Sequence, residues 1–472
     1  MSLVYGLFDE SFFVNFEVID TINYLLFSHF YLMALTIEDF KEQLNKSIIN
    51  ADVVKIFDNL LTIAVEMEAS DVHIESFEDY CRMRLRLDGE LQELVQYPKS
   101  LHESIISKFK IESGQMRPDE RRLPQDARVS TMTLTNKEID LRASTLPTIW
   151  WEKLVMRIVD KSKKTPQLDD LGIEWSNRDI ILRQLSSPNG IILTTGPTWS
   201  GKTSTLYAAL NYINTVDVNI LTFEDPVENK MHGLNQSQVR SDIWFTFASG
   251  LRAALRQDPD IIMVWEIRDG ETLVMAMEAA MTWHLVLSTI HTNSSAETIT
   301  RVFNLGALPY MVAGTFNVVM AQRLTRRICP HCIHKTSVKD TVQWSQALDA
   351  FHGLNPETLK QEITKRGITP DQWRDFVTNG MMIEWSGKDP TTGETCIHCG
   401  GTGYKGRIGI YEIMEYTDEI RNKLVAGKTA YEIENFALSQ GMINLERDGV
   451  LKIIKWYTTL DEIYRIVKHK KI

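Results

Sequence analysis

The chain has 472 residues, of which 43% are hydrophobic and 24% charged, as in an ordinary folded protein with room for two or three domains. Its formal net charge of -11 disfavours nucleic acid as a partner, because general nucleic-acid-binding proteins are mostly basic. No signal peptide is recognisable, and the apolar N-terminal stretch is interrupted by Glu17 and Asp20, which makes it a poor candidate for a membrane span. These features predict a cytoplasmic protein.

Residues 1–46 are predicted to be an N-terminal extension that ends in a helix. Residues 1–32 are rich in aromatic side chains and lack periodicity, whereas Thr36 and Asp39 have the spacing of a capping box before an amphipathic helix. Two interpretations stay open. Either Met33 is the true start of the protein, or residues 1–32 form an ordinary N-terminal helix.

Residues 47–160 are predicted to form a small α+β domain. The stretches 51–69 and 100–113 have the periodicity of helices. Between them, residues 71–94 alternate in the manner of strands, with an Asp-Gly pair as the hairpin turn. Three arginines alternate there with three apolar residues, which predicts one charged and one buried face.

Residues 177–472 are predicted to form an α/β domain, joined to the first by a polar linker at 161–176 that contains a proline. Short apolar strands alternate with helices, which favours a mostly parallel sheet. The segment 333–395 is polar and irregular in pattern, and 415–472 is helical. In such sheets the chemistry takes place at the carboxyl ends of the strands, where polar residues lie in this sequence.

Residues 196–203, "GPTWSGKT", match the phosphate-binding pattern G-x-x-x-x-G-K-[ST], with an apolar strand before it and a helix after it. Backbone N–H groups of such a loop cradle phosphates. Lys202 is predicted to reach the β- and γ-phosphates of ATP, and the Thr203 hydroxyl to coordinate Mg²⁺. The predicted nucleotide-binding residues are Gly196, Pro197, Thr198, Trp199, Ser200, Gly201, Lys202, Thr203 and Ser204.

Acidic residues and histidines follow the other apolar strands. Glu266 ends the strand "DIIMVWE" and is the first candidate for the catalytic carboxylate, which orients a water molecule and accepts its proton. Glu224, in "TFEDPVE", is the second candidate. His284 and His291 flank "LVLSTI" and are candidate sensors of the γ-phosphate.

Four of the five cysteines form two C-x-x-C pairs, which in a reducing compartment are typical of a zinc site. The predicted ligands are Cys329, Cys332, Cys396 and Cys399. The segment 329–399 is then an insertion closed by the metal. Cys81, on a predicted strand, is expected to be a buried core residue.

Taken together, these residues resemble the secretion ATPases of type II secretion and type IV pilus assembly. The resemblance runs from about Ala69 to Lys468. It rests on "ASDVHIE", "RLPQDARVS" and "DLRASTLPT" in the first domain, and on "GPTWSGKTSTLYA", "FEDPVE", "LRAALRQDPDIIMVWEIRDGET", "HLVLSTIHTN", "AQRLTRRICPHC" and "CIHCGGTGYKGRIGIYEIM" in the second.

The resemblance implies a RecA-like ATPase domain with a smaller N-terminal domain, assembled as a homohexamer that binds ATP, Mg²⁺ and Zn²⁺. It implies that Arg128 and Arg142 reach the nucleotide from the N-terminal domain. It also implies a partner, an inner-membrane platform protein, and a position at the inner face of the cytoplasmic membrane. The cysteine pairs favour assembly and export members over retraction members, whereas the long N-terminal region of many assembly members is missing.

Two alternatives to this ATPase stay open. One is a catalytically impaired scaffold relative, which Trp199 favours. The other is a DNA-transfer ATPase of a conjugation system, against which the cysteine pairs and the acidic balance argue.

Tryptophan stands at motif positions where the resembled family usually has glycine. These positions are Trp199, Trp265 and Trp283, and with a less certain alignment Trp151, Trp175 and Trp456. The neighbouring motif residues are intact, so we hypothesise that the codon UGA, which some bacterial lineages read as glycine, has been read here as tryptophan. Restoring glycine at Trp199, Trp265 and Trp283 is then expected to restore ATP turnover.

Overall fold

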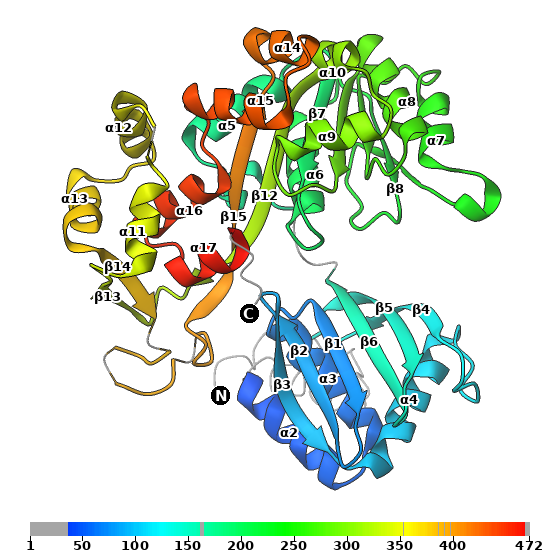
Figure 1. Cartoon of the computed structure of the whole chain (residues 1–472). Coiled ribbons are helices and arrows are strands. Elements are labelled where there is room, and N and C mark those ends of the chain that lie inside the picture. The colour runs from blue at the N-terminus through cyan, green and yellow to red at the C-terminus, as the bar shows by residue number, and fades with distance from the viewer. Residues whose placement is uncertain are drawn as a thin grey trace, which may run out of the picture. The chain divides into compact units, whose positions relative to one another are not determined.

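The computed structural model describes residues 36–160, 165–352, 354–385, 387–390, 392–396 and 398–467, apart from the side chains of 383–385. The two interpretations of residues 1–32 lie outside this part of the chain. Between Lys164 and Thr165 the chain divides into two compact units (Figure 1). Throughout the described ranges, no helix combines the length and the apolar character that crossing a membrane requires.

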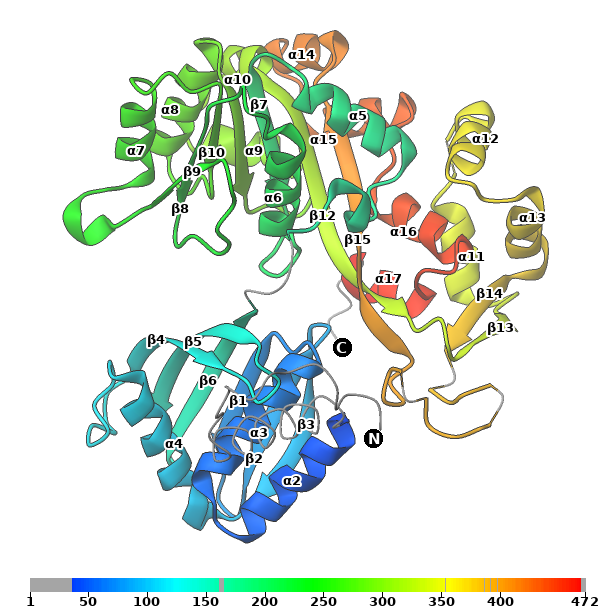
Figure 2. The ribbon, with the colours of Figure 1, turned by 180° about the vertical axis from the view of Figure 1, so that it is seen from behind.

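The first unit consists of a six-stranded antiparallel sheet and three helices. Its elements are α2 (Ile37–Ile49), α3 (Val53–Glu66), β1 (Asp71–Ser76), β2 (Cys81–Leu87), β3 (Glu90–Tyr97), α4 (Lys99–Ser113), β4 (Gln125–Met132), β5 (Glu138–Pro147) and β6 (Glu152–Asp160). The strand order is β3-β2-β1-β6-β5-β4. Helices α2 and α3 lie on one side of the sheet, as the view from behind shows (Figure 2).

Helix α2 begins at the predicted capping box. The Thr36 side chain accepts a hydrogen bond from the backbone N–H of Asp39, and the Asp39 carboxylate accepts one from the backbone N–H of Thr36. Phe40 and Leu44 are buried in the core that the helices share with the sheet, so α2 is part of the first unit rather than an extension of it. On β2, Met83 is buried in the same core.

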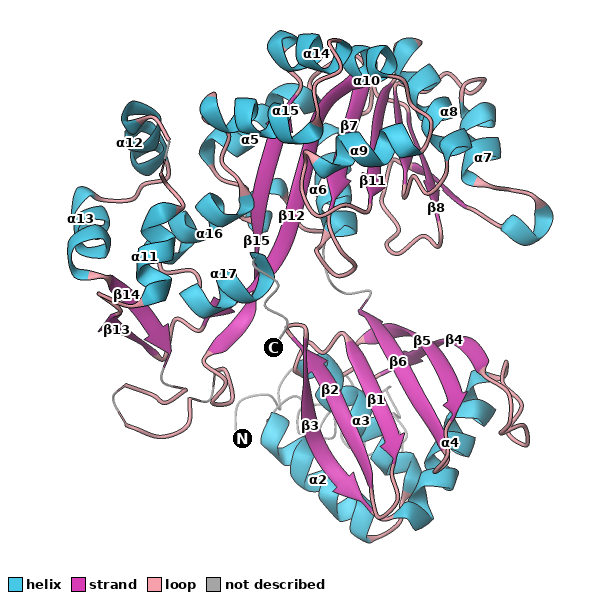
Figure 3. Ribbon diagram, viewed as in Figure 1, coloured by secondary structure: helices cyan, strands magenta, loops and turns pink. Residues whose placement is uncertain are grey.

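The second unit contains a seven-stranded sheet covered by helices on both faces (Figure 3). Its first half comprises η1 (Leu168–Leu171), α5 (Trp175–Leu185), β7 (Gly190–Thr195), α6 (Lys202–Ile213), β8 (Ile220–Glu224), β9 (Asn235–Gln238), η2 (Ser241–Ile243), α7 (Phe247–Ala254), β10 (Ile261–Val264), α8 (Gly270–Met281) and β11 (Leu285–Ile290). Its second half comprises α9 (Glu297–Asn304), α10 (Pro309–Thr315), β12 (Phe316–Ile328), β13 (Ile333–Ser337), α11 (Val342–Asp349), α12 (Pro356–Lys365), α13 (Pro370–Asn379), β14 (Met381–Trp385), β15 (Tyr404–Glu415), α14 (Asp418–Val425), α15 (Ala430–Ser439), α16 (Leu445–Ile454) and α17 (Leu460–Val467).

The order of this sheet is β15-β12-β7-β11-β10-β8-β9, and its pairs are parallel except for β12 with β15. Strands β7, β10 and β11 are buried along their whole length, which explains their continuous apolar sequences. The mostly parallel α/β sheet predicted from the sequence is therefore confirmed. Leu168 and Ile173 are buried in its core, so the second half of the segment taken as a linker packs onto this unit.

The segment between the cysteine pairs is more regular than its sequence pattern indicates. It forms the two-stranded antiparallel sheet β13–β14 and helices α11, α12 and α13, which share a core with α16 and α17. Arg366, fully buried after α12, donates to the Asp448 carboxylate on α16 at 2.6 Å. The three helices have only 8 to 10 residues each, and helices that short give a weak periodic signal.

Candidate nucleotide and metal sites

The phosphate-binding loop joins the carboxyl end of β7 to the N-terminus of α6. A Cβ atom on Gly196 would lie 2.6 Å from the Gln322 carbonyl oxygen, so only glycine fits the close approach of β12. Gly201 has φ +87°, a left-handed conformation that also favours glycine. From β12, Gln322 Nε2 donates to the Ser200 carbonyl oxygen at 2.7 Å and holds the loop in place.

Lys202 lies inside this loop. Its Nζ donates to the carbonyl oxygens of Gly196 at 2.8 Å and Pro197 at 3.1 Å, and lies 3.4 Å from His291 Nδ1. Burial lowers the pKa of Lys202 to about 8, because desolvation penalises the ammonium form. A phosphate oxygen that replaced these carbonyls would give the ammonium a charged partner in their place.

Glu266 and His291 extend the same group of side chains. His291 Nε2 lies 3.0 Å from Glu266 Oε1, and Arg268 Nε donates to Glu266 Oε2 at 2.8 Å. The structure thus brings together Lys202, His291 and Glu266, which follow the neighbouring strands β7, β11 and β10. This is the arrangement expected at the carboxyl edge of a parallel sheet.

The second candidate carboxylate, Glu224, has a different environment. It is fully buried and accepts hydrogen bonds from the Tyr207 hydroxyl, from Thr222 Oγ1 at 2.6 Å and from Gln236 Nε2 at 3.0 Å. These donors tie β8 to α6 and β9. Because protein groups already occupy its oxygens, Glu224 is better placed to support the loop than to bind a reacting water.

The two histidines that flank β11 lie at opposite ends of that strand. Leu285 pairs with Gly190, at the start of β7, whereas Ile290 pairs with Thr195, next to the phosphate-binding loop. His284 therefore lies at the far end, where its Nδ1 is 2.9 Å from the Ala279 carbonyl oxygen. Of the two candidate sensors, His284 thus lies away from the phosphate-binding loop, whereas His291 lies beside it.

Arg323 is a site residue that the sequence reasoning missed. It is buried on β12 and donates to the carbonyl oxygens of Gln322 at 3.0 Å and Asn293 at 2.8 Å. Burial lowers its pKa, and its positive charge contributes to the lowered pKa of Lys202. A polar Gln-Arg pair inside an apolar strand was the signal in the sequence.

The predicted magnesium ligand, the Thr203 hydroxyl, already has a hydrogen-bond partner in this chain. Thr203 Oγ1 accepts a hydrogen bond from Trp265 Nε1 at 3.2 Å. The bulky indole of Trp265, packed against the core beneath α6, therefore lies against the hydroxyl that a Mg²⁺ ion would need. With tryptophan at 265, the residues present do not fit Mg²⁺ beside Thr203.

Arg128 and Arg142 lie directly opposite each other on β4 and β5 of the first unit. Arg142 is in turn paired with Arg157 on β6, and Arg157 Nε lies 3.3 Å from Asp71 Oδ1 on β1. The two predicted arginines thus belong to a row of charged residues that crosses the sheet. Arg157 is a further member of this row.

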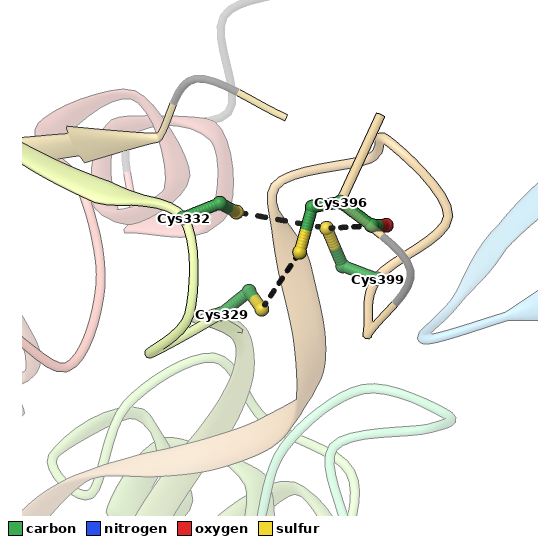
Figure 4. Close-up of side chains that lie close together, drawn as sticks. All are labelled: Cys329, Cys332, Cys396 and Cys399. Atoms are coloured by element: carbon green, nitrogen blue, oxygen red, sulfur yellow. Dashed lines mark hydrogen bonds between the residues drawn. The ribbon is translucent and has the colours of Figure 1, made fainter. Parts of the chain in front are cut away.

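The four cysteines of the C-x-x-C pairs come together between the ends of β12 and β15 (Figure 4). Their sulfur atoms all lie within 4.8 Å of one another, with 4.0 Å between Cys329 and Cys396 and 3.6 Å between Cys332 and Cys399. A tetrahedral zinc site with Zn–S bonds of about 2.3 Å has sulfurs about 3.8 Å apart, so this set of donors fits Zn²⁺.

The backbone around this cluster adds support. The Gly403 N–H donates to Cys399 Sγ at 3.3 Å, and its carbonyl oxygen accepts from the Cys329 N–H at 2.9 Å. His331 and His398 stack on each other, with ring centroids 3.6 Å apart, and are not among the clustered ligand atoms. Cys81 is buried in the core of the first unit, as predicted.

Comparison with known proteins identifies the family. The family model described as "Type II/IV secretion system protein" matches residues 47–465. The chain is 38% identical over 422 residues to the type IV pilus assembly ATPase PilB of Myxococcus xanthus, covering 89% of this chain and 69% of that protein. It is 42% identical to PilB of Thermus thermophilus, of which it covers 42%, and 37% identical to type II secretion system protein E of Aeromonas hydrophila, of which it covers 76%.

Solved structures share the fold. The ATPase DotB of Legionella pneumophila matches with a TM-score of 0.60 at 18% identity, over 88% of this chain and 96% of that one. The pilus retraction motor PilT, solved with ADP, matches with a TM-score of 0.53 at 22% identity, over 87% and 96%. From its family match and its identity to these relatives, the chain belongs to the type II/IV secretion system protein family.

Proposed function

We propose that this protein is an ATPase that powers the assembly of a type IV pilus or of the pseudopilus of type II secretion. The observation that carries the proposal is the contact series at the phosphate-binding loop. Lys202 lies beside His291, and His291 beside Glu266. In a member of a family with named pilus assembly ATPases, this geometry favours hydrolysis of a nucleoside triphosphate.

The side chains have separate roles in the proposed reaction. Lys202 leaves the loop carbonyls and pairs with the phosphates of ATP. Glu266, which is only 13% exposed, orients a water molecule in line with the γ-phosphate and accepts its proton. His291, between the two, detects whether the γ-phosphate is present.

The assembly that we propose is a homohexamer, in which Arg128 and Arg142 of the N-terminal unit reach the nucleotide. A planar guanidinium suits the charge that develops on the phosphate during transfer. Hydrolysis then changes the angle between the two units. That motion passes to an inner-membrane platform protein, so the hexamer works in the cytoplasm, at the inner face of the membrane.

Two other functions remain as rival proposals. A scaffold subunit without ATPase activity is favoured by Trp199 in the loop and by Trp265 against Thr203. A DNA-transfer ATPase of a conjugation system shares the fold. The four clustered cysteines and the net charge of -11 argue against it.

The test is phosphate release from ATP by purified protein that carries W199G and W265G, which removes both indoles from the site. Lys202→Ala in the same background is the control. Turnover that depends on Lys202 supports the proposal. Equal release by both proteins would contradict it, and an absence of turnover in a folded, zinc-loaded protein would favour the scaffold.

A further inference from the structure

Tryptophan has an unusual backbone conformation in this protein. It accounts for 11 of 472 residues, yet for six of the twelve non-glycine residues with positive φ in the described part of the chain. Four of the other six are Asn or Asp, the residues that tolerate this conformation. Five tryptophans have φ between +41° and +71°, namely Trp175, Trp199, Trp244, Trp283 and Trp456, and Trp151 is the sixth, at +159°.

Two of these tryptophans follow helices at the position that normally requires glycine. After α8, the His284 N–H donates to the Ala279 carbonyl oxygen, and after α16 the Tyr457 N–H donates to the Lys452 carbonyl oxygen. Both bonds close a Schellman motif, whose left-handed residue is most often glycine because it has no Cβ. Trp283 and Trp456 occupy that residue.

Glycine occupies the corresponding position after other helices of the second unit. Gly306, Gly427 and Gly441 follow α9, α14 and α15 with φ of +98°, +74° and +99°. The next residue in each case donates to the carbonyl five positions earlier, as it does after Trp283 and Trp456. The backbone at Trp283 and Trp456 thus has the same left-handed conformation and the same closing hydrogen bond as at these glycines.

The side chains at these positions gain little from packing. Trp244 is 87% exposed, Trp283 77% and Trp199 48%, although the indole is among the largest apolar side chains. By contrast, Trp373 has a helical position, contacts Phe351 edge-on and packs against a core. The exposed tryptophans therefore combine backbone strain with an exposed apolar surface.

Trp265 does not have a left-handed backbone conformation, but the place of its side chain is a separate reason to expect glycine at this position. Its indole lies on the Thr203 hydroxyl, where a side chain no larger than a hydrogen atom would leave room for a metal ion. Trp199 lies three residues before Lys202, in a loop where Gly196 and Gly201 are required by close contact and by positive φ. Both tryptophans conflict with the nucleotide site, and Trp283 lies at the opposite end of β11.

We propose that Trp175, Trp199, Trp244, Trp265, Trp283 and Trp456 are glycines in the protein that the cell makes, because their codon, UGA, is decoded there as glycine. Tryptophans with ordinary backbone and ring contacts, such as Trp373, are encoded by UGG. For Trp265 the inference rests on the proposed ATPase function. For the other five it rests on the left-handed backbone, together with the exposure of their side chains, and does not depend on the ATPase function.

Mass spectrometry of the protein from the cells that encode it tests the proposal directly. Trypsin releases residues 184–202, which contain Trp199, and residues 257–268, which contain Trp265. Both peptides are expected to have the mass for glycine, and UGA is expected at both codons. Residues 367–374 are the control peptide and are expected to retain Trp373. Tryptophan in the first two peptides would overturn the proposal.

Thermal unfolding tests the backbone argument without reference to ATP. Trp244→Gly, Trp283→Gly and Trp456→Gly are expected to raise the melting temperature by about 2 °C each. The matched alanine variants are expected to gain less, because alanine keeps a Cβ atom in the left-handed region. Trp373→Gly is expected to lower the melting temperature. Glycine variants no more stable than the alanine variants would contradict the argument.

Different results would refute the ATPase function and the decoding of UGA as glycine. Glycine in the peptides together with an inactive glycine-containing protein would refute the ATPase and leave the decoding intact. Tryptophan in the peptides would refute the decoding and leave the scaffold as the better function.

Discussion

At the scale of single residues, the structure separates the two candidate carboxylates. Glu266 lies beside His291, whereas the oxygens of Glu224 are taken up by Tyr207, Thr222 and Gln236. In the protein that carries W199G and W265G, here called the glycine-restored protein, Glu266→Gln is expected to lower kcat by about 10²–10⁴-fold. ATP is still expected to bind, because only the proton acceptor is lost.

Glu224→Gln is the matched control for this prediction. It is expected to lower the free energy of unfolding by roughly 1–3 kcal/mol, because an amide cannot accept from all three buried donors, with a smaller loss of kcat. Steady-state kinetics and thermal unfolding of the two variants distinguish these roles. A larger loss of kcat for Glu224→Gln than for Glu266→Gln would mean that Glu224 is the catalytic carboxylate.

The lowered pKa of Lys202 predicts a pH dependence of nucleotide binding. Without nucleotide the pKa is about 8, and phosphates are expected to raise it because they stabilise the ammonium. Binding above pH 8 must therefore take up a proton, so the affinity for ATP should fall about tenfold between pH 7 and pH 9. Calorimetric titration measures this change, and a Lys202→Ala variant with the same pH dependence would show that another group causes it.

Much of the site followed from local sequence, and the remainder depended on neighbours distant in the chain. The phosphate-binding loop and Glu266 could be predicted because strand, loop and helix are contiguous. The support role of Glu224 could not, since it depends on contacts from α6 and β9. For Arg323 the sequence carries the Gln-Arg pair in β12, but its contact with the distant Asn293 required the fold. The indole on Thr203 likewise required the β10 edge to be placed beside α6.

At the scale of elements, the four cysteines lie close together between the ends of β12 and β15. Purified protein is expected to contain about one Zn²⁺ per chain, and Cys329→Ser or Cys396→Ser to lose it, because a closed site needs four ligands. Metal analysis measures the content, and limited proteolysis should show early cleavage within 333–395. Cys81→Ala, in the core of the first unit, is expected to keep the metal. Freshly prepared, unchelated protein without zinc would contradict the prediction.

The elements of the two sheets were more predictable than the segment that the cysteines enclose. Continuous apolar strands such as β7 and the alternation in β2 reflect burial on two faces and on one face, respectively. Helices α11 to α13 were missed because each is short and is stabilised by distant contacts, such as that of Arg366 with Asp448. Leu168 and Ile173 were placed in the predicted linker for a similar reason, because their burial depends on contacts with distant residues of the second unit.

At the scale of the whole molecule, the proposed hexamer predicts a role for the first unit in catalysis. In the glycine-restored protein, Arg128→Ala is expected to lower kcat by about 10²-fold with little change in ATP affinity, because the guanidinium acts on the transition state. The exposed Arg122→Ala, in the same unit, is the control. Light scattering should show a hexamer for all three proteins. Equal kcat in Arg128→Ala and its parent would mean that this arginine does not reach the nucleotide.

The proposed ATPase hydrolyses its nucleotide at the loop between β7 and α6. The most direct measurement is phosphate release from ATP by the protein with glycine at positions 199 and 265, compared with the same protein carrying Lys202→Ala. We expect steady turnover that Lys202→Ala abolishes. A folded, zinc-loaded protein that releases no phosphate, or turnover that survives the loss of Lys202, would contradict hydrolysis at this loop.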